Sequence, residues 1–308
     1  MRLKKVFVLG ASMVALALVI TSCGSTGGPS SSSSSPKASV TVGALNFPES
    51  AILAQIYGQA LKGKGYSVSY KLNLGSREVV EPALERGDIN LFPDYAATEL
   101  EFQNKGKGEA TPDAAATVTK LNTYLTSKGL KALTASPAVD QNAFAVLKSG
   151  KYGSKTKLSD LSSVASQMTL GGPAECPTRP FCEAGLTSKY GLHFKGFKAL
   201  DAGGPLTKAA LDKGDIDLGL IFSSDSAYST GKYVQLQDDM HLQNADNVVP
   251  LIKASLANDE VTSLLNEIDS KLTTDDLIKL NKSSDVDKQD PDVIAKKWLT
   301  DHGYSTGS

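Results

Sequence analysis

The sequence has little of what metal-binding and nucleic-acid-binding proteins need. It contains three Cys and three His in 308 residues, too scattered for the short, clustered spacings of zinc sites. Lys and Arg total 32 against 33 Asp and Glu, so no excess of positive charge is available to hold DNA or RNA. We therefore expect no metal site and no nucleic-acid partner.

Motifs of the common enzyme classes are also missing. The chain has no Gly-x-Ser-x-Gly elbow, His-Glu-x-x-His helix, Walker loop or Gly-x-Gly-x-x-Gly turn, and His193, His241 and His302 are isolated in sequence. The doublets Asp238-Asp239 and Asp275-Asp276 lie beside a predicted turn and at a predicted helix start, where carboxylates favour the helix dipole. These patterns predict a protein that is not an enzyme and uses no cofactor.

Only one apolar run approaches membrane-spanning length, and it lies at the N-terminus. Positive residues precede an uncharged stretch over residues 6–20, which is 15 residues long and shorter than the roughly 20 that span a bilayer. We interpret residues 1–22 as a signal peptide. The run ends in Thr21-Ser22-Cys23, which resembles the bacterial lipobox, so Cys23 is the predicted lipidation site. A plain signal peptide with an incidental Cys is the alternative.

Residues 23–37 form the predicted tether behind that Cys. Between residues 24 and 36 the chain is almost entirely Ser and Gly, a composition that cannot bury a core and behaves as flexible coil. The tether would hold the following domain close to the membrane.

The next segment has the pattern of a strand, a helix and a second strand. Residues 40–42 alternate as a strand, apolar residues between Ile52 and Leu61 recur at helical spacing, and residues 66–72 alternate again. Such a βαβ unit predicts an α/β protein with a parallel sheet and a ligand at the carboxyl ends of its strands.

A short internal repeat predicts two lobes. Residues 83–91 return as residues 210–218, an offset of 127, and each copy has the pattern of a helix end, a Gly at the C-cap and a strand. Two unrelated helix–strand turns are the alternative. The chain ends in predicted helices from residue 255 onward, the last opening at Asp290-Pro291 and expected to pack on the first lobe.

Several segments resemble one family, the osmoprotectant (glycine betaine, carnitine, choline) substrate-binding proteins of ABC importers. They are residues 44–50, 94–98, 171–182 and 201–206, and the similarity spans residues 39–300. The resemblance implies a bilobal type II periplasmic-binding-protein fold with two crossovers. Lobe one would comprise residues 38–144 with 248–308, and lobe two residues 145–247.

The resemblance also implies how a quaternary ammonium is held. Such a cation cannot donate a hydrogen bond, so aromatic faces must bind it through cation–π attraction. Tyr95 matches the family's aromatic wall, with Asp94 adding negative charge and Thr98 a hydroxyl. Phe222 stands where a further aromatic wall is expected, although a core position is the alternative.

The other walls depart from the family pattern. Ala143 falls where many members have a Tyr, so Phe144 either substitutes for that Tyr or belongs to the core, and residues 243–247 contain no aromatic. An incomplete cage indicates weak betaine binding or another cationic or zwitterionic solute, such as choline or ergothioneine.

Recognition of a ligand carboxylate requires a guanidinium or backbone donors. Arg179 is placed for this role by the family pattern, with a surface ion pair as the alternative, and Arg77 and Asn46 are weaker candidates. Cys176 and Cys182 have five residues between them, and in an oxidising compartment they are expected to form a disulfide that braces the Arg179 loop. Free thiols or a redox pair are the alternatives.

The resulting interpretation is a monomeric lipoprotein, anchored on the extracytoplasmic face of the cell membrane, that passes a small quaternary ammonium compound to an ABC permease. Glycine betaine or a related betaine is the leading solute. An exported hydrolase and a sensory or adhesive surface protein that reuses the fold are the competing hypotheses.

Overall fold

The computed structural model describes residues 37–307. The predicted signal peptide and the Cys23 lipidation site lie outside the described residues and stay predictions. Between residues 37 and 307, no helix has both the length and the apolar character needed to cross a membrane.

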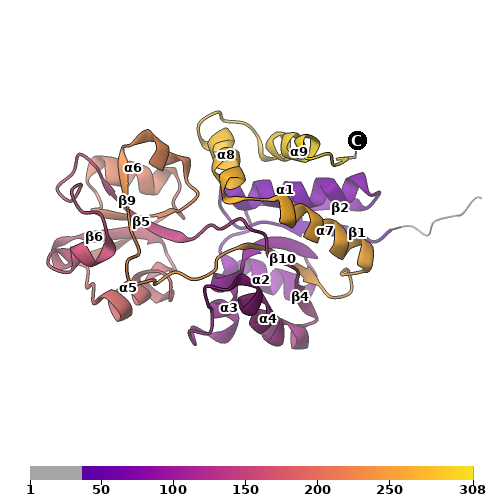
Figure 1. The fold of residues 1–308 in the computed structure, drawn as a ribbon, viewed down its shortest axis with the longest axis horizontal. Coiled ribbons are helices and arrows are strands. Elements are labelled where there is room, and N and C mark those ends of the chain that lie inside the picture. The colour runs from indigo at the N-terminus through magenta and orange to yellow at the C-terminus, as the bar shows by residue number, and fades with distance from the viewer. Residues whose placement is uncertain (1–36, 308) are drawn as a thin grey trace, which may run out of the picture. The chain divides into compact units, whose positions relative to one another are not determined.

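Two five-stranded mixed sheets organise the described chain (Figure 1). The first has the order β2 (Ser67–Lys71), β1 (Ser39–Gly43), β3 (Leu91–Tyr95), β10 (Val248–Lys253) and β4 (Leu130–Ala132). The second has the order β7 (Gly196–Leu200), β6 (Thr169–Pro173), β8 (Leu218–Phe222), β5 (Asn142–Leu147) and β9 (Tyr233–Leu236).

The two sheets share one topology. In each, three parallel strands are followed by an antiparallel strand, which is β10 in the first sheet and β5 in the second. The chain passes to the second sheet after β4 and returns to the first after β9. This arrangement, with its two crossovers, is the predicted bilobal α/β fold. The predicted lobe limits themselves stay a prediction.

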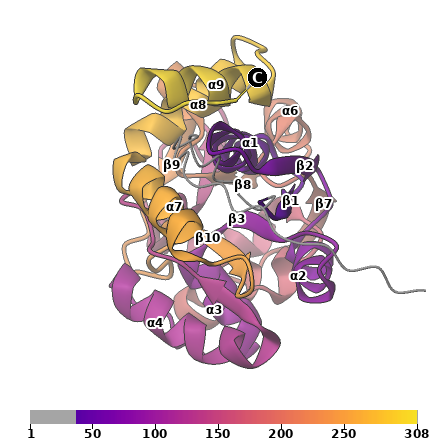
Figure 2. The ribbon, with the colours of Figure 1, turned by 90° about the vertical axis from the view of Figure 1, so that its right-hand side faces the viewer.

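Helices cover both sheets. They are α1 (Pro48–Gly63), α2 (Arg77–Arg86), α3 (Ala96–Asn104), α4 (Ala114–Leu125), α5 (Glu183–Tyr190), α6 (Pro205–Lys213), α7 (Asp259–Lys271), α8 (Thr274–Asp285) and α9 (Pro291–Asp301). α9 begins with Pro at its first position after Asp290, as predicted. It lies beside α1 (Figures 1 and 2), where Gln59 Nε2 donates to the Asp292 carbonyl at 2.9 Å and Trp298 joins the core of the first sheet. The prediction that the last helix packs on this part of the chain is confirmed.

The internal repeat corresponds to two equivalent helix–strand units. α2 ends at Gly87 with φ 84°, and α6 ends at Gly214 with φ 74°; this left-handed conformation is easy only for Gly. Each unit then enters a central strand, β3 or β8. The repeat interpretation is therefore confirmed over two unrelated turns.

The equivalence extends to side-chain packing. Ile89 in the first copy and Ile216 in the second each lie against a glycine of the neighbouring strand. A Cβ built on Gly43 would approach Ile89 Cδ1 to 2.5 Å, and one on Gly171 would approach Ile216 Cδ1 to 2.5 Å. At both contacts a larger residue than glycine would force the isoleucine side chain to move.

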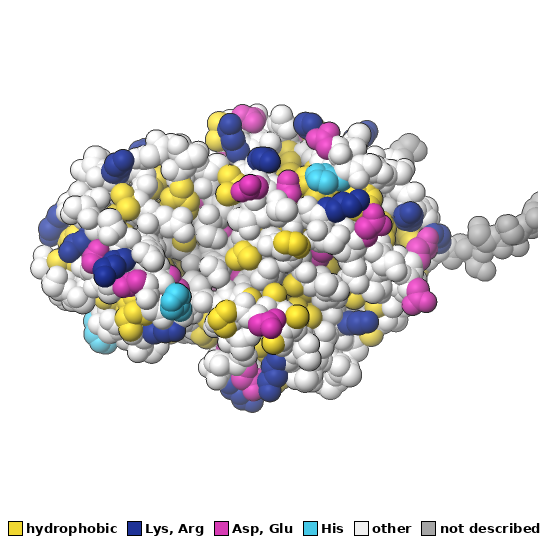
Figure 3. Space-filling model, viewed as in Figure 1, with side chains coloured by type: hydrophobic (Ala, Val, Ile, Leu, Met, Phe, Trp, Pro, Cys, Tyr) yellow, Lys and Arg dark blue, Asp and Glu magenta, His cyan; other side chains and the backbone are white. Residues whose placement is uncertain are grey.

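Separate apolar cores fill the space around the two sheets. The first contains α1, β1, β3, β10 and the C-terminal helices, while the second collects residues of β5, β6, β8 and α5. On the face shown in Figure 3, Lys and Arg side chains alternate with Asp and Glu side chains, consistent with a net charge of −1. The two cores hold the sheets in place, and the loops at the ends of the strands are the part of the fold where a binding site can form.

Candidate functional site

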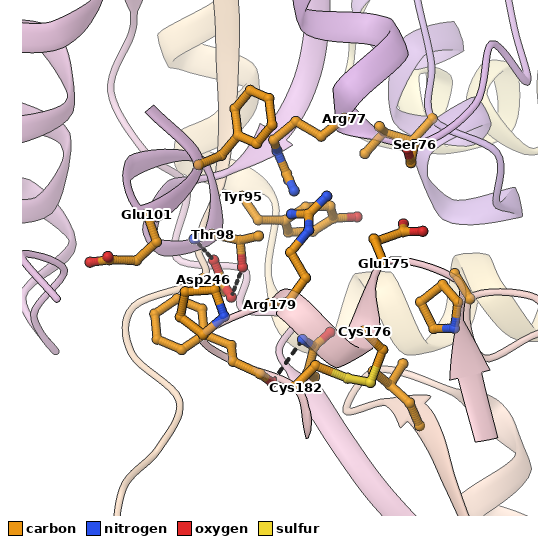
Figure 4. Close-up of a pocket in the computed structure, with 18 of the residues that line it drawn as sticks. Ser76, Arg77, Tyr95, Thr98, Glu101, Glu175, Cys176, Arg179, Cys182 and Asp246 are labelled. Carbon is orange, nitrogen blue, oxygen red and sulfur yellow. Dashed lines mark hydrogen bonds between the residues drawn. A yellow bond between two sulfur atoms is a disulfide. The ribbon is translucent and has the colours of Figure 1, made fainter. Parts of the chain in front are cut away.

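A cavity of about 350 Å³ lies where the carboxyl ends of strands from both sheets meet (Figure 4). Its lining includes segments that follow β1, β2 and β7 and the last residues of β3, β6 and β8. Open α/β sheets place ligands at this edge of the strands. The volume falls within the range of about 300–1,000 Å³ that is usual for small-molecule sites.

Three aromatic rings from different elements meet at this cavity. Phe47 precedes α1, Tyr95 ends β3 and Phe222 ends β8. The ring centroids of Phe47 and Tyr95 are 6.1 Å apart, and those of Phe47 and Phe222 are 5.1 Å apart. Phe102 and Phe181 also line the cavity. Because the rings come from both sheets, a small molecule in the cavity that touches all three would contact both halves of the described chain.

Tyr95 lines the cavity, and a hydrogen bond from its hydroxyl fixes its side chain. Its hydroxyl donates to Glu49 Oε1 at 2.5 Å, and the residue is 7% exposed. Burial, followed by the charges of Glu49 and Asp140, raises the Tyr95 pKa well above its usual value. The phenol therefore stays protonated and its ring orientation is fixed.

Asp94 and Arg77 neutralise each other. Arg77 Nε donates to Asp94 Oδ2 at 2.9 Å, a second guanidinium nitrogen bonds Asp94 Oδ1, and Nε lies 2.9 Å from Glu99 Oε2. Burial disfavours the Arg77 cation, but its acidic partners outweigh burial and raise its pKa. Asp94 is 0% exposed and does not line the cavity. The structure thus corrects the expectation that Asp94 offers free charge to a ligand.

Thr98 lines the cavity but its polar groups are occupied. Its hydroxyl donates to Asp246 Oδ2 and its backbone N–H to Asp246 Oδ1, both at 2.7 Å (Figure 4). Burial raises the pKa of Asp246 to about 6, against these two hydrogen bonds that lower it. Asp246 falls in the stretch where the sequence offered no aromatic, and it supplies a carboxylate to the lining instead.

Arg179 reaches into the same region of the cavity as Tyr95 and Arg77 (Figure 4). One guanidinium nitrogen bonds Glu78 Oε1 at 2.7 Å, and its central carbon lies 5.8 Å from the Phe102 ring centroid. Burial, together with the nearby Arg77, lowers the Arg179 pKa. Arg179 therefore lines the cavity and also forms an ion pair, so the two roles predicted as alternatives are not exclusive.

Asn46 and Phe144 differ in their placement. Asn46 is exposed and lines the cavity. Phe144 is 1% exposed in the core of the second sheet and is not part of the lining. β5 carries it two residues beyond Asn142, which does reach the cavity. The suggestion that Phe144 replaces a cage aromatic is wrong, and its alternative as a core residue holds.

Cys176 and Cys182 are joined by a disulfide in the structure, in the segment that carries Arg179 to the cavity. Both half-cystines also line the cavity. The oxidation state in the cell stays a prediction.

Acidic groups elsewhere have local partners. Asp238 accepts from the Tyr190 hydroxyl and two backbone N–H groups, and Asp239 accepts from Ser159. Among residues 37–307, no group of three or more His, Cys, Asp and Glu side chains is arranged to hold a metal ion.

Sequence reasoning overlooked Phe47, Phe102, Phe181 and Asp246 as lining residues. A signal existed for Phe47, since it lies in the loop after the first strand, where ligands bind in such sheets. Phe102, on α3, and Phe181, beside a Cys, carry no local pattern that separates a pocket residue from a core residue.

The paired sheets, the two crossovers and the shared cavity define the class of bilobal solute-binding proteins with the type II fold. The chain belongs to the OpuAC family, described as the substrate binding domain of ABC-type glycine betaine transport system, which matches residues 38–301. Members of this family are solute-binding components of importers rather than enzymes, and they work outside the cytoplasm.

Individual proteins agree with this assignment. The chain is 25% identical to the Glycine-betaine-binding protein of Pseudomonas aeruginosa, covering 85% of this chain and 87% of that one. It is 26% identical to the Carnitine transport binding protein OpuCC of Listeria monocytogenes, covering 99% of each. A crystal structure of a glycine betaine/carnitine/choline ABC transporter protein shares the fold, with a TM-score of 0.67 at 22% identity, over 86% of this chain and 99% of that chain.

Proposed function

We propose that this protein binds a small quaternary ammonium osmoprotectant, with glycine betaine or a related betaine as the leading solute, and delivers it to the permease of an ABC importer. The observation that carries the proposal is the contact set of Phe47, Tyr95 and Phe222 at the cavity. A methylated ammonium has no hydrogen to donate, so aromatic faces are the surfaces that attract it.

Closure of the two halves would complete the site. Tyr95 and Phe47 belong to the first sheet's side of the cavity, and Phe222 ends a strand of the second sheet. A ligand that contacts both sides stabilises the arrangement in which the sides are close, because only that arrangement provides all the contacts. The permease would then recognise the closed form.

Choline is the second candidate, favoured by the charges of the lining. The two arginines of the lining are engaged, Arg77 with Asp94 and Arg179 with Glu78, which leaves Lys105 as the remaining basic side chain of the lining. The acidic lining residues also include Glu175, whose carboxylate has no hydrogen-bond partner among residues 37–307. A cation without a carboxylate needs none of these partners, whereas a betaine must draw Arg179 away from Glu78 or use Lys105 or backbone donors.

The membrane location rests on the sequence. We propose a monomer that is lipidated at Cys23 and linked by the Ser/Gly tether, with the Cys176–Cys182 disulfide formed after export. Mass spectrometry of the membrane fraction tests this directly: Cys23 should carry lipid at a new N-terminus, and Cys23→Ser should release the protein from the membrane. An unmodified Cys23 would contradict the anchor.

Binding is tested by calorimetric titration of the full chain, purified in detergent, with glycine betaine, choline and carnitine. Phe47→Ala is the informative variant, because Phe47 is only partly buried and its loss leaves no hydrogen bond unmade. A desolvated cation–π contact is worth about 2 kcal/mol, so the affinity should fall about 30-fold.

Phe197→Ala is the matched control. Phe197 is a partly buried aromatic of the second core that does not line the cavity, so its variant should keep the affinity. Wild-type protein that binds none of the three solutes would contradict the proposed function. Equal affinity in the wild type and Phe47→Ala would remove Phe47 from the site.

A further inference from the structure

Glu49 is a buried carboxylate that accepts a hydrogen bond from Tyr95, one of the aromatic residues of the cavity. It lies in the first turn of α1, two residues after Phe47, and is 4% exposed. Negative charge in the first turn of a helix is favoured by the helix dipole. One short segment therefore supplies both a ring of the cavity, Phe47, and the carboxylate that holds a second ring, Tyr95.

Three donors converge on the Glu49 carboxylate. The Tyr95 hydroxyl donates to Oε1 at 2.5 Å, while the Ser224 hydroxyl at 2.8 Å and Asn281 Nδ2 at 2.6 Å donate to Oε2. Asn281 Nδ2 also donates to Ser224 Oγ at 2.9 Å, which leaves the serine hydrogen for Glu49. This donor set suits an ionised carboxylate, which accepts and does not donate.

A second buried carboxylate lies close to this network. Asp140 is 5% exposed, lines the cavity, and accepts from the backbone N–H of Ser224. Burial and the charge of Glu49 raise the pKa of Asp140 well above its usual value. Burial also raises the pKa of Glu49, but the hydrogen bonds from Tyr95, Asn281 and Ser224 oppose that rise. Because two neighbouring buried carboxylates disfavour a second negative charge, these three donors favour Glu49 as the ionised member.

We propose that Glu49 is a specificity-determining positioning residue, whose hydrogen bond to Tyr95 and buried negative charge make the aromatic site select a positively charged headgroup over an uncharged one of the same shape. This inference rests on the proposed function and deepens it. Glu49 does not line the cavity, so it would act through Tyr95 and through the field of its buried charge.

Two physical effects produce the selection. A phenol that donates to a carboxylate carries more electron density on its ring, which strengthens its attraction for a cation. The buried charge also attracts the cation directly. At an effective dielectric of about 20, an attraction of about 1.4 kcal/mol between two such charges changes an affinity about tenfold.

The network also joins elements from both sides of the cavity. Glu49 and Asn281 belong to helices α1 and α8, whereas Ser224 follows β8 of the second sheet. The position of Ser224 relative to α1 therefore affects how firmly Tyr95 is held, so the network links the orientation of the ring to the approach of the two halves.

The test compares each ligand with its carbon analogue. The full chain, purified in detergent, is titrated with choline or glycine betaine, whichever the wild type binds, and with the analogue in which carbon replaces the quaternary nitrogen. Glu49→Gln should reduce the ratio of the two affinities about tenfold. Tyr95→Phe, which keeps the ring, should reduce it about threefold, and Glu49→Gln in the Tyr95→Phe background should have a smaller effect than it has alone.

Asp269→Asn is the matched control. Asp269 is a fully buried carboxylate that accepts from the Tyr57 hydroxyl at 2.7 Å, and neither residue lines the cavity. This variant should keep the wild-type ratio. If Glu49→Gln fails to fold, Tyr95→Phe decides the question through its own ratio.

The outcomes separate the two proposals. A wild type that binds no quaternary ammonium would overturn the proposed function and this inference with it. A wild type that binds, with a ratio unchanged in Glu49→Gln or in Tyr95→Phe, would overturn this inference alone. Equal losses for the charged ligand and its analogue would show a merely structural role and would also overturn it.

Discussion

Replacing Arg77 by Met should destabilise the protein strongly. Arg77 is 6% exposed and pairs with Asp94 and Glu99, both of which are 0% exposed. Methionine fills similar apolar space but leaves the carboxylates without their cation. Breaking a buried ion pair from one side costs about 3–5 kcal/mol, so the free energy of unfolding at pH 7 should fall by about that amount.

The loss should also depend on pH. The pKa of Glu99 is already raised well above its usual value by burial and by Asp94, despite the opposing charge of Arg77. Without Arg77 the folded-state pKa of Glu99 rises further. A group whose folded pKa is raised loses its stabilising contribution as pH rises, so the destabilisation of Arg77→Met relative to the wild type should grow as pH rises above the wild-type folded pKa of Glu99 and should be smaller at acid pH.

Urea unfolding followed by circular dichroism at several pH values measures both effects. Arg86→Met is the control, because Arg86 pairs with Asp88 at 61% and 47% side-chain exposure and exposed pairs contribute at most about 1 kcal/mol. A loss below about 1 kcal/mol in Arg77→Met, or a loss of equal size at all pH values, would refute the account of the buried cluster.

Three further predictions concern stability. Burial and Asp94 raise the pKa of Glu81 to about 7, so the wild type loses stability as Glu81 ionises. The free energy of unfolding of Glu81→Gln should therefore rise relative to that of the wild type between pH 5 and 8. A difference between the two proteins that does not change with pH would contradict this. Gly171→Ala places a Cβ 2.5 Å from an isoleucine methyl and should cost about 1–3 kcal/mol in calorimetry, whereas Gly196→Ala, with no atom within 4 Å, should not show this loss. Replacing both Cys176 and Cys182 by Ser should lower the urea midpoint by the equivalent of about 2 kcal/mol; an unchanged midpoint would argue against a stabilising disulfide.

The architecture was accessible from sequence because it depends on local patterns that repeat. The Gly that ends each helix and the strand that follows occur twice at one offset, so Gly87 and Gly214 indicated two equivalent halves before any contact was known. Proline after Asp290 likewise marked the start of the last helix. Such features depend on residues that are close together in the chain, so they can be recognised in a single sequence.

The site was only partly accessible because burial and pairing involve residues far apart in the chain. Asp94 is next to Tyr95 in sequence, yet Arg77 from α2 removes its charge from the cavity. Phe144 and Phe222 both belong to strands of the second sheet, and only their distance from the strand end separates a core residue from a lining one. Glu49 carried no motif, since its partners Ser224 and Asn281 follow it by 175 and 232 residues.

A crystal structure of the protein grown with glycine betaine or choline would test the central claim most directly. The account predicts that the methylated ammonium lies in the cavity in van der Waals contact with the rings of Phe47, Tyr95 and Phe222, with Tyr95 still bonded to Glu49. Density for the ligand outside these rings, or a saturated crystal with the cavity filled by another solute, would contradict it.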